Sequence, residues 1–390
     1  MAKRLRLLTL ATLILAIQAG VMAWGGPGAF AQMPPNEQIT VLQLPPASPH
    51  WIATMTPLSG SIMMTPILLI DGDSLQVIGS ISGGLAAMFA ISPDHKEFYT
   101  ADTFYSRGVQ GDRTDVITIY DATHLSRSGE IAISNKRQLA LADPSSMSVT
   151  TDGRFLLLLN LTPATSVTAV DLQGKKVAGE IQTPGCSEIL MLGAREFASV
   201  CADGSMLTTQ FDDSAKATSQ KRTAKPFFDV EKDPVFQLPA MIDKKAYFVS
   251  YHGVVYPMDV GSSPAAAEET WSMLTDKDKK DGWRPGGWQP VAGYTPGHLL
   301  FVLMHQGGEW TQKVGGPEVW VYDLKTHKRV NRIPLPAKSN AIRVSQDDNP
   351  LLFALVTSES QLQVFSALKG RYNGTVSEVS QHPYTLFGLY

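Results

Sequence analysis

The sequence predicts an all-β fold made of seven repeated four-stranded units, with one short helical insertion. Three observations lead to this prediction. A β-rich run ending in Asp recurs along the chain, a strand–turn–strand element recurs between these runs, and glycine and proline are frequent but scattered. The chain has 390 residues, of which 32 are Gly and 25 are Pro. Such scattering is expected when many short strands have to be joined by turns.

The first repeated feature is a run of five or six residues that is rich in β-branched and aromatic side chains and ends in Asp. A turn and a further strand follow each run, and Ser replaces Asp in the last copy. The ends of successive runs lie 41 to 64 residues apart. The seven runs are Ile67–Asp71, Val116–Asp121, Val167–Asp171, Leu207–Asp212, Val254–Asp259, Val319–Asp323 and Leu362–Ser366.

The second repeated feature is a strand, a tight turn and another strand. Its copies are Met88–Thr100, Met147–Leu159 and Ile342–Leu355, and their turns contain Pro, Asp, Gly and Asn. These residues supply a preset φ, a tolerance of positive φ, or side-chain bonds to the backbone. A period of about 40 to 50 residues with four short strands per unit is typical of a propeller, in which small sheets stack around an axis and bury one another.

We therefore predict a seven-bladed β-propeller. A pair of β-sandwiches would also use short strands, but the near-constant period and the absence of a linker disfavour that alternative. The two chain ends should close the ring, because closure removes an exposed sheet edge. We expect Ile39–Leu44 or Trp51–Met55 to pair with strands near Thr375–Tyr384 in one sheet.

The longest interval between repeats contains the expected helical insertion. Pro264–Glu269 and Leu274–Lys280 are rich in helix formers and lack strand alternation. They lead into Asp281–Gln289, an excursion that contains two tryptophans. An insertion in one blade lies on one face of the ring, where functional loops are usually found.

The N-terminus has the layout of a secretory signal peptide. Three basic residues among the first six precede an apolar run from Leu7 to Met22, and Ala29-Phe30-Ala31 supplies small residues at a cleavage site. A membrane anchor is the alternative, which Gly and Gln within the run disfavour. We expect a signal peptide at 1–31, one propeller domain at 32–390, and a mature periplasmic protein without a membrane span.

Composition and motifs exclude several classes of function. The net charge of −3 gives no support for nucleic-acid binding, which needs a strong basic excess. None of the eight histidines stands at metal-ligand spacing from another. Nucleophile-elbow, Walker and dinucleotide-binding motifs are missing from the sequence. We therefore predict neither a metal nor a catalytic residue in this chain, although a site assembled from several blades stays open.

Two cysteines, Cys186 and Cys201, each lie beside an apolar run, with a turn at Gly193–Arg195 between them. Antiparallel neighbours joined by that turn would bring the two thiols close together. In an oxidising compartment a structural disulfide is the natural interpretation. Two buried free thiols are the alternative, and the spacing excludes a haem-attachment motif.

The first candidate interaction site is Asp102–Arg107, continued by Gly111–Asp115. It combines two aromatic residues and two arginines with several acids, and arginine is a bidentate donor. A rim that faces a partner and an ordinary solvated loop both fit this composition. The candidate contact residues are Phe104, Tyr105, Arg107 and Arg113.

Two further segments are candidates. The excursion Asp281–Gln289 carries Trp and Arg, which dominate binding hot spots, although packing of the tryptophans between blades is an equal alternative. Pro57–Met64 is a candidate lining of an apolar substrate passage, with simple closure of the last blade as the alternative. The candidate residues are Trp283, Arg284 and Trp288 for contacts, and Leu58, Ser61, Met63 and Met64 for the passage.

Several of these stretches resemble the heavy subunits of the tryptophan tryptophylquinone amine dehydrogenases, which comprise the methylamine and aromatic-amine enzymes. The resemblance runs from about residue 65 to 365, and Asp281–Gln289 is its most specific part. The matching stretches are Tyr105–Arg107, Gly111–Asp115, Thr162–Ser166, Lys232–Phe236, Phe248–Tyr251, Asp281–Gln289, Val344–Asp348 and Pro350–Leu355.

The resemblance implies a division of labour. The quinone belongs to a small, disulfide-rich light subunit, whereas the heavy subunit is a cofactor-free propeller that holds the light chains in a complex of two heavy and two light subunits. It also helps to present that complex to a blue copper electron acceptor, and Cys186 and Cys201 resemble its disulfide pair. An aromatic residue of the family falls within Leu58–Met64, where this sequence has none.

The resemblance leaves the substrate open between methylamine-like and aromatic primary amines, which would be oxidised to aldehyde and ammonia. A function of a different class also remains. The chain could instead be a self-sufficient periplasmic propeller, either an enzyme or a binding module, with a site in its central channel.

Overall fold

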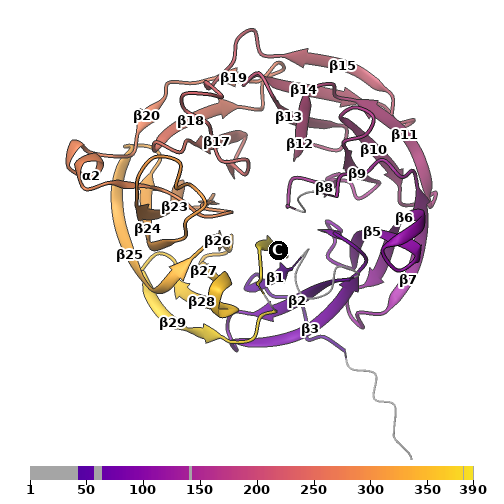
Figure 1. Ribbon diagram of the computed structural model, residues 1–390, viewed down its shortest axis with the longest axis horizontal. Helices are drawn as coiled ribbons and strands as arrows, with labels where there is room; N and C mark the ends of the chain where they lie inside the picture. Colours follow the sequence, from indigo (N-terminus) through magenta and orange to yellow (C-terminus); the bar gives the residue numbers. More distant parts are fainter. Residues whose placement is uncertain (1–42, 57–63, 140–142, 381, 390) are drawn as a thin grey trace, which may run out of the picture. The chain divides into compact units, whose positions relative to one another are not determined.

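Seven β-sheets are arranged around a central axis in the unit Gln43–Tyr390 (Figure 1). The computed structural model describes residues 43–56, 64–139, 143–380 and 382–389. All strand pairs are antiparallel within the sheets, which we number as blades 1 to 7 in chain order. The predicted seven-bladed β-propeller is confirmed.

Each blade has four positions, counted outwards from the axis. The innermost strands are β30 (Thr385–Gly388), β4 (Met88–Ile91), β8 (Met147–Val149), β12 (Cys186–Met191), β16 (Ala240–Ile242), β21 (Trp283–Pro285) with β22 (Val291–Tyr294), and β26 (Ala341–Val344). The second strands are β1 (Trp51–Met55), β5 (Glu97–Arg107), β9 (Phe155–Asn160), β13 (Glu196–Cys201), β17 (Lys245–Val249), β23 (Leu299–Gln306) and β27 (Leu351–Val356). The third strands are β2 (Thr65–Asp71), β6 (Gln110–Asp121), β10 (Ser166–Asp171), β14 (Met206–Phe211), β18 (Val254–Asp259), β24 (Gly316–Asp323) and β28 (Gln361–Ser366). The outermost strands are β3 (Gln76–Gly83), β7 (Arg127–Ile133), β11 (Lys176–Gln182), β15 (Ala217–Arg222), β19 (Ala266–Ala267) with β20 (Trp271–Ser272), β25 (Lys328–Ser339) and β29 (Arg371–Val376).

The recurring Asp closes the turn from the third strand to the outermost strand. Asp171 accepts the backbone N–H of Gly174 at 2.8 Å, and Asp323 accepts those of Lys325 and Thr326, both at 2.8 Å. A short carboxylate that bonds its own backbone two or three residues on stabilises a tight turn. The repeat in the sequence is therefore the repeat of one turn, which Asp makes in six blades and whose place Ser366 takes in blade 7.

The turn from the innermost to the second strand uses a hydroxyl and a carboxylate in a similar way. The Oγ of Ser345 donates to Asp347 at 2.6 Å and accepts the N–H of Leu351 at 2.9 Å. Thr150 and Asp152 repeat this arrangement in blade 3, where the hydroxyl-to-carboxylate distance is 2.6 Å. These are the turns of the second repeated feature in the sequence.

The two chain ends close the ring in blade 1. Strand β1 (Trp51–Met55) pairs with β30, so that Thr54 lies opposite Leu386. The prediction that Trp51–Met55 takes part in closure is confirmed. Its partner is Thr385–Gly388 rather than the predicted Thr375–Tyr384, because Thr375 belongs to β29, the outer strand of blade 7.

The helical insertion is shorter than expected. Helix α2 (Asp276–Lys280) begins with a capping box in which Thr275 and Asp278 bond each other's backbone N–H. Pro264–Glu269 was expected to be helical and is not, since its Ala266–Ala267 pairs with β18 as the outer edge of blade 5. Completing the fourth strand of the blade outweighs the helix propensity of alanine and glutamate.

The core consists of apolar layers between neighbouring blades. In one such layer Phe155 of blade 3 packs against Phe211 of blade 4 at 6.0 Å between ring centroids. The cysteines lie directly opposite each other on β12 and β13 and form the Cys186–Cys201 disulfide. The predicted disulfide is confirmed.

Candidate functional site

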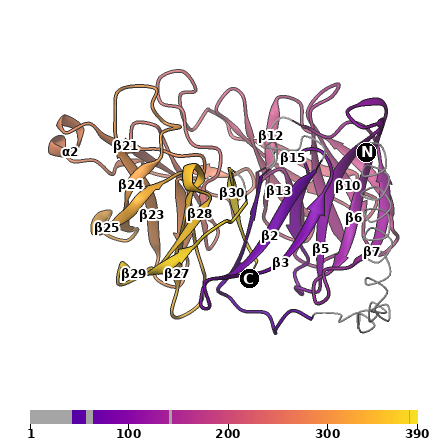
Figure 2. The ribbon, with the colours of Figure 1, turned by 60° about the horizontal axis from the view of Figure 1, so that its bottom comes forward.

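All of the described candidate residues lie on one face of the ring. We call it the upper face and define it as the face where the innermost strands begin, which is the upper side of Figure 2. Strand β5 runs antiparallel to β4, with Ala101 opposite Met88, so Phe104 and the residues that follow extend beyond the start of β4. The start of β21 and the residues before β22 reach the same face.

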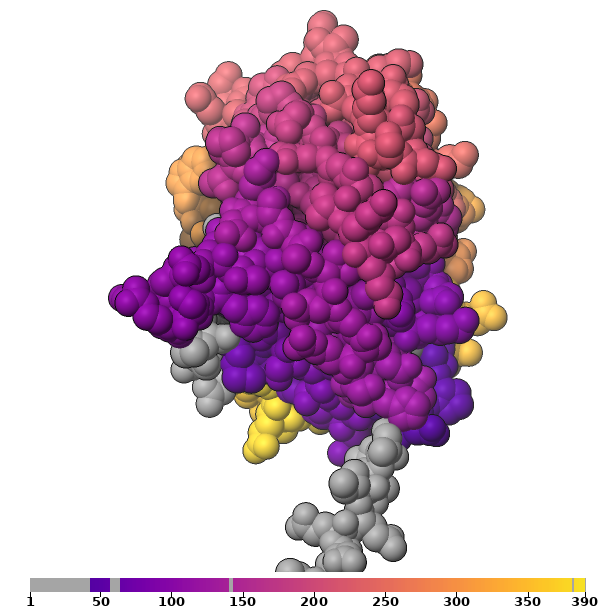
Figure 3. All heavy atoms as spheres, turned by 90° about the vertical axis from the view of Figure 1, so that its right-hand side faces the viewer, coloured from indigo at the N-terminus to yellow at the C-terminus, as the bar shows by residue number. Residues whose placement is uncertain are grey.

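The β5–β6 hairpin projects from this face in blade 2 (Figure 3). Phe104 and Val109 are each 46% exposed, which is unusual for large apolar side chains. Arg107 is exposed, and no carboxylate of the described residues lies within ion-pair distance of it. Tyr105 is half-buried opposite Arg113. The hairpin therefore offers an aromatic side chain and a free guanidinium to solvent.

A buried polar network holds the base of this hairpin. Arg137 is 2% exposed and donates to Thr103 at 2.9 Å and to the carbonyls of Leu85 and Ala86. Burial lowers the pKa of Arg137 to about 10, although Asp115 nearby acts in the opposite direction. Such a network fixes the hairpin's direction, because each buried polar group needs its partner.

Arg113 belongs to that network rather than to the exposed tip. It bonds Asp115 through Nε at 2.9 Å and through Nη2 at 2.6 Å, and Asp115 has no exposed side-chain surface. The two arginines predicted in this loop thus have different environments. Whether either one contacts a partner stays a prediction.

The second candidate segment packs largely within blade 6. The ring of Trp283 lies 5.1 Å from that of the fully buried Trp320, and the guanidinium of Arg332 lies 5.0 Å above Trp283. Arg284 is half-buried beside His305, and burial together with the charge of Arg284 lowers the pKa of His305 to about 4. Trp283 therefore packs inside the protein, which is the alternative that the sequence left open beside a role in partner contacts.

Trp288 differs, since it is 38% exposed. Its ring lies 5.0 Å from that of Tyr384, and the Nζ of Lys313 lies 4.9 Å from the ring centre. The preceding Gly287 has a φ of +128°, and a Cβ there would lie 2.5 Å from the carbonyl oxygen of Asn340. Glycine is needed for this close approach of two backbones, which positions Trp288 beside Tyr384.

Gln289 follows as a buried clamp on the closing strand. Its Oε1 accepts the Thr385 hydroxyl at 2.7 Å and the Leu386 N–H at 3.0 Å, and its Nε2 donates to the Leu386 carbonyl at 3.1 Å. The side chain is 3% exposed. Gln289 is the last residue of Asp281–Gln289, the stretch that most specifically resembles the heavy-subunit family, and it holds β30 against blade 6.

Three titratable residues near the centre of the upper face were missed by sequence reasoning. Asp143, Trp288 and Tyr384 line one small cavity there, and burial raises the pKa of both Asp143 and Tyr384, that of Tyr384 to about 12. Burial, and then the charge of Asp143, raises the pKa of Glu188 well above its ordinary value. Asp143, Glu188 and Tyr384 come from three different blades, so their spacing in the sequence does not show that they are neighbours.

The predicted substrate passage can be followed only at its end. Met64 lies at the start of β2 on the upper face and is 43% exposed. Leu58, Ser61 and Met63 lie outside the described residues. No group of three His, Cys, Asp or Glu side chains with metal-binding geometry occurs in the part of the chain that the structure describes.

The comparison with protein families decides the identity. The model of the methylamine dehydrogenase heavy chain family matches residues 58–388. The chain belongs to this family. The methylamine dehydrogenase heavy chain of Methylophilus methylotrophus is 30% identical over 327 residues, which cover 83% of this chain and 80% of that protein. That of Methylorubrum extorquens is 31% identical over 318 residues, or 81% and 77% of the two chains.

Solved structures agree with the fold of this heavy-chain family member. The dihydro-haem d1 dehydrogenase NirN has a TM-score of 0.55 at 14% identity, and the match covers 91% of this chain and 78% of that one. A putative 6-phosphogluconolactonase from Bacteroides fragilis has a TM-score of 0.57 at 12% identity, covering 86% and 97%. At these identities the likeness concerns the fold alone. No helix within the described ranges is long and apolar enough to cross a membrane.

Proposed function

We propose that this chain is the cofactor-free heavy subunit of a periplasmic quinoprotein amine dehydrogenase, which oxidises primary amines to aldehyde and ammonia. The observation that carries the proposal is the family match over residues 58–388. The relatives over most of this length are methylamine dehydrogenase heavy chains. In this role the chain would scaffold a light subunit that bears tryptophan tryptophylquinone and would pass electrons to a blue copper protein.

The chemistry explains why two subunits are needed. A quinone cofactor would supply an electrophilic carbonyl that reacts with a primary amine, and no standard side chain provides such a group. A propeller can contribute position, exclusion of water and a docking surface. We assign that contribution to the upper face, where Phe104, Arg107 and Trp288 are exposed.

The proposed location in the periplasm is supported by two features. The N-terminal 31 residues have the pattern of a signal peptide, and Cys186 and Cys201 are joined, as expected in an oxidising compartment. N-terminal sequencing of the periplasmic protein should give a start at or near Gln32. A membrane-bound product that retains Met1 would contradict the proposed export and cleavage.

Co-purification from the native periplasm tests the subunit role. We expect a small, cysteine-rich protein carrying the quinone to elute with this chain in a complex of two heavy and two light subunits. Arg107→Glu should weaken that association, because the exposed guanidinium of Arg107 lacks a carboxylate partner among the described residues. Arg127→Glu is the matched control, since Arg127 is exposed on the outer strand β7 of the same blade.

The expected pattern is normal association of the Arg127 variant and weakened association of the Arg107 variant. Equal association of both would remove the hairpin tip from the interface. A chain that elutes alone from the native periplasm, with no small quinone-bearing protein, would contradict the subunit role itself.

A further inference from the structure

The innermost strands enclose two cavities beside the axis of the ring. One, of about 240 Å³, lies along β16, β22 and β26, and the other, of about 210 Å³, lies along β4, β8 and β30. Arg343 lines both. The lining of the first includes Pro239, Met241, Val291, Thr295 and Gln346, and that of the second includes Phe89, Ile91, Met147, Ser148 and Phe387.

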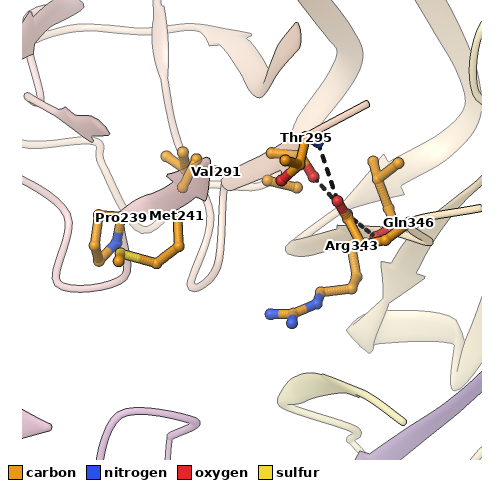
Figure 4. A pocket seen from close by; sticks show the side chains of 10 residues that line it. Pro239, Met241, Val291, Thr295, Arg343 and Gln346 are labelled. Carbon is orange, nitrogen blue, oxygen red and sulfur yellow. Dashed lines mark hydrogen bonds between the residues drawn. The ribbon is translucent and has the colours of Figure 1, made fainter. Parts of the chain in front are cut away.

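The position of Arg343 on β26 directs its side chain to the axis. Its neighbours Ile342 and Val344 are 0% and 2% exposed and pack into the core of the blade. Since successive side chains of a strand point to opposite faces, Arg343 points away from that core. Figure 4 shows its guanidinium extending into open space, away from Thr295 and Gln346.

No protein group neutralises this charge within the described part of the chain. Among the described residues, Arg343 has no carboxylate or carbonyl partner within hydrogen-bond or ion-pair distance. Its neighbour Gln346, by contrast, donates to the carbonyls of Gly293 and Val344. The surrounding protein lowers the pKa of Arg343, and no nearby acid raises it. The side chain is exposed to solvent, so the guanidinium is a permanent cation that a dissolved anion can reach.

A glycine keeps one edge of the guanidinium open. A Cβ on Gly388 of β30 would lie 3.1 Å from Nε of Arg343 and 3.2 Å from Nη2. These two nitrogens form one of the edges with which arginine binds a carboxylate through two parallel bonds. Because residue 388 is glycine, no side chain of its own covers that edge.

The chemistry of the second cavity narrows the class of anion. Arg343 supplies its one formal charge, and the hydroxyl of Ser148 is the other polar side-chain group on its lining. Phe89, Ile91 and Phe387 contribute apolar side chains to the same lining. A divalent oxyanion such as phosphate would bring more charge and more acceptors than these donors satisfy. A carboxylate with a short apolar tail matches both the single charge and the walls.

We propose that Arg343 forms an anion subsite in the central channel that binds a small organic monocarboxylate. The carboxylate lies against the guanidinium of Arg343, and the apolar tail packs towards Phe89 and Phe387. This site is separate from the upper-face residues of the proposed subunit interface and does not rest on the proposed function.

Calorimetric titration of the purified protein, with any subunit that co-purifies, tests the site with propionate and benzoate as probes. Phosphate and chloride at equal ionic strength are the comparison anions. We expect saturable binding of one propionate or benzoate per chain. Arg343→Met should weaken it by at least about tenfold, the loss expected for a charge-assisted hydrogen-bonded pair. Arg371→Met is the matched control, because Arg371 is exposed on the outer strand β29 of the same blade.

Two further measurements keep the outcome clear. In the absence of anion, Arg343→Met should melt close to the temperature of the unchanged protein, because Arg343 is exposed and no hydrogen bond or ion pair joins it to another described residue. Gly388→Ala should weaken binding with Arg343 still present, since its methyl group covers the Nε–Nη2 edge. Saturable binding that survives in Arg343→Met, tighter binding of phosphate than of propionate and benzoate, or no saturable binding of either probe would each overturn the proposal.

Discussion

Replacing Gln289 by leucine should release the closing strand from the ring. The change removes the partner of three buried groups, namely the Thr385 hydroxyl and the N–H and carbonyl of Leu386. Thr385 and Leu386 are 2% and 0% exposed, so water does not readily replace the lost bonds. A buried polar group left unsatisfied costs about 1–3 kcal/mol. Three such groups give an expected loss of about 3–5 kcal/mol, with some relief from local relaxation.

The midpoint of guanidinium chloride unfolding and hydrogen exchange of the C-terminal peptide measure this loss. We expect a lower midpoint and faster exchange in Thr385–Gly388. Gln306→Leu is the control, since Gln306 is exposed and donates only to the carbonyl of Asp281. It should change the free energy of unfolding by less than about 0.5 kcal/mol. A loss below about 1 kcal/mol for Gln289→Leu, or unchanged exchange in β30, would refute the clamp.

Three further predictions concern ion pairs and the disulfide. Burial alone would lower the pKa of His50, but its hydrogen bonds to Asp73 and Asp347 raise that pKa above 6.5. The charged imidazole therefore contributes its full stabilisation below pH 6.5. This contribution is lost as the pH rises through the raised pKa. His50→Gln should flatten this decline in melting temperature, whereas exposed His382→Gln should not, and an unchanged slope in the His50 variant would count against the stabilising role of the His50 charge. Replacing both cysteines by alanine removes a bridge that spans 15 residues. The free energy of unfolding should fall by about 3 kcal/mol in the chain-entropy model. Two freely alkylatable thiols in the native protein would contradict the bridge. Arg113→Met should cost at least about 2 kcal/mol, because it removes the two charge-assisted bonds that Arg113 makes to the buried Asp115, and an unfolding free energy equal to that of Arg107→Met would contradict this.

The sequence was sufficient for the blades because one local interaction recurs in six of the seven. Asp171 and Asp323 make the same turn with their own backbone, so the repeat in the sequence follows directly from the repeat in the structure. The helix expected at Pro264–Glu269 failed because pairing with β18 decides that segment, and a pairing partner is not visible in a local pattern.

Prediction of the site was limited by residues that meet only after the ring has closed. The charge of Asp143 raises the pKa of Glu188 across blades 3 and 4, and the spacing of the two residues in the sequence does not predict this. The alternation Ile342-Arg343-Val344 does indicate that Arg343 points away from the blade core. This alternation does not show whether Arg343 points to the axis of the ring or to the outer solvent. The direction depends on β26 being the innermost strand of its blade.

The most direct test of the proposed function is amine-dependent dye reduction by the isolated chain beside the reconstituted complex. The isolated chain should show no visible quinone absorption and no amine oxidation, since its own side chains provide no electrophilic carbonyl. Activity should appear when the quinone-bearing light subunit is added, and electrons should then pass to a small copper protein. Full turnover of primary amines by this chain alone would contradict the account.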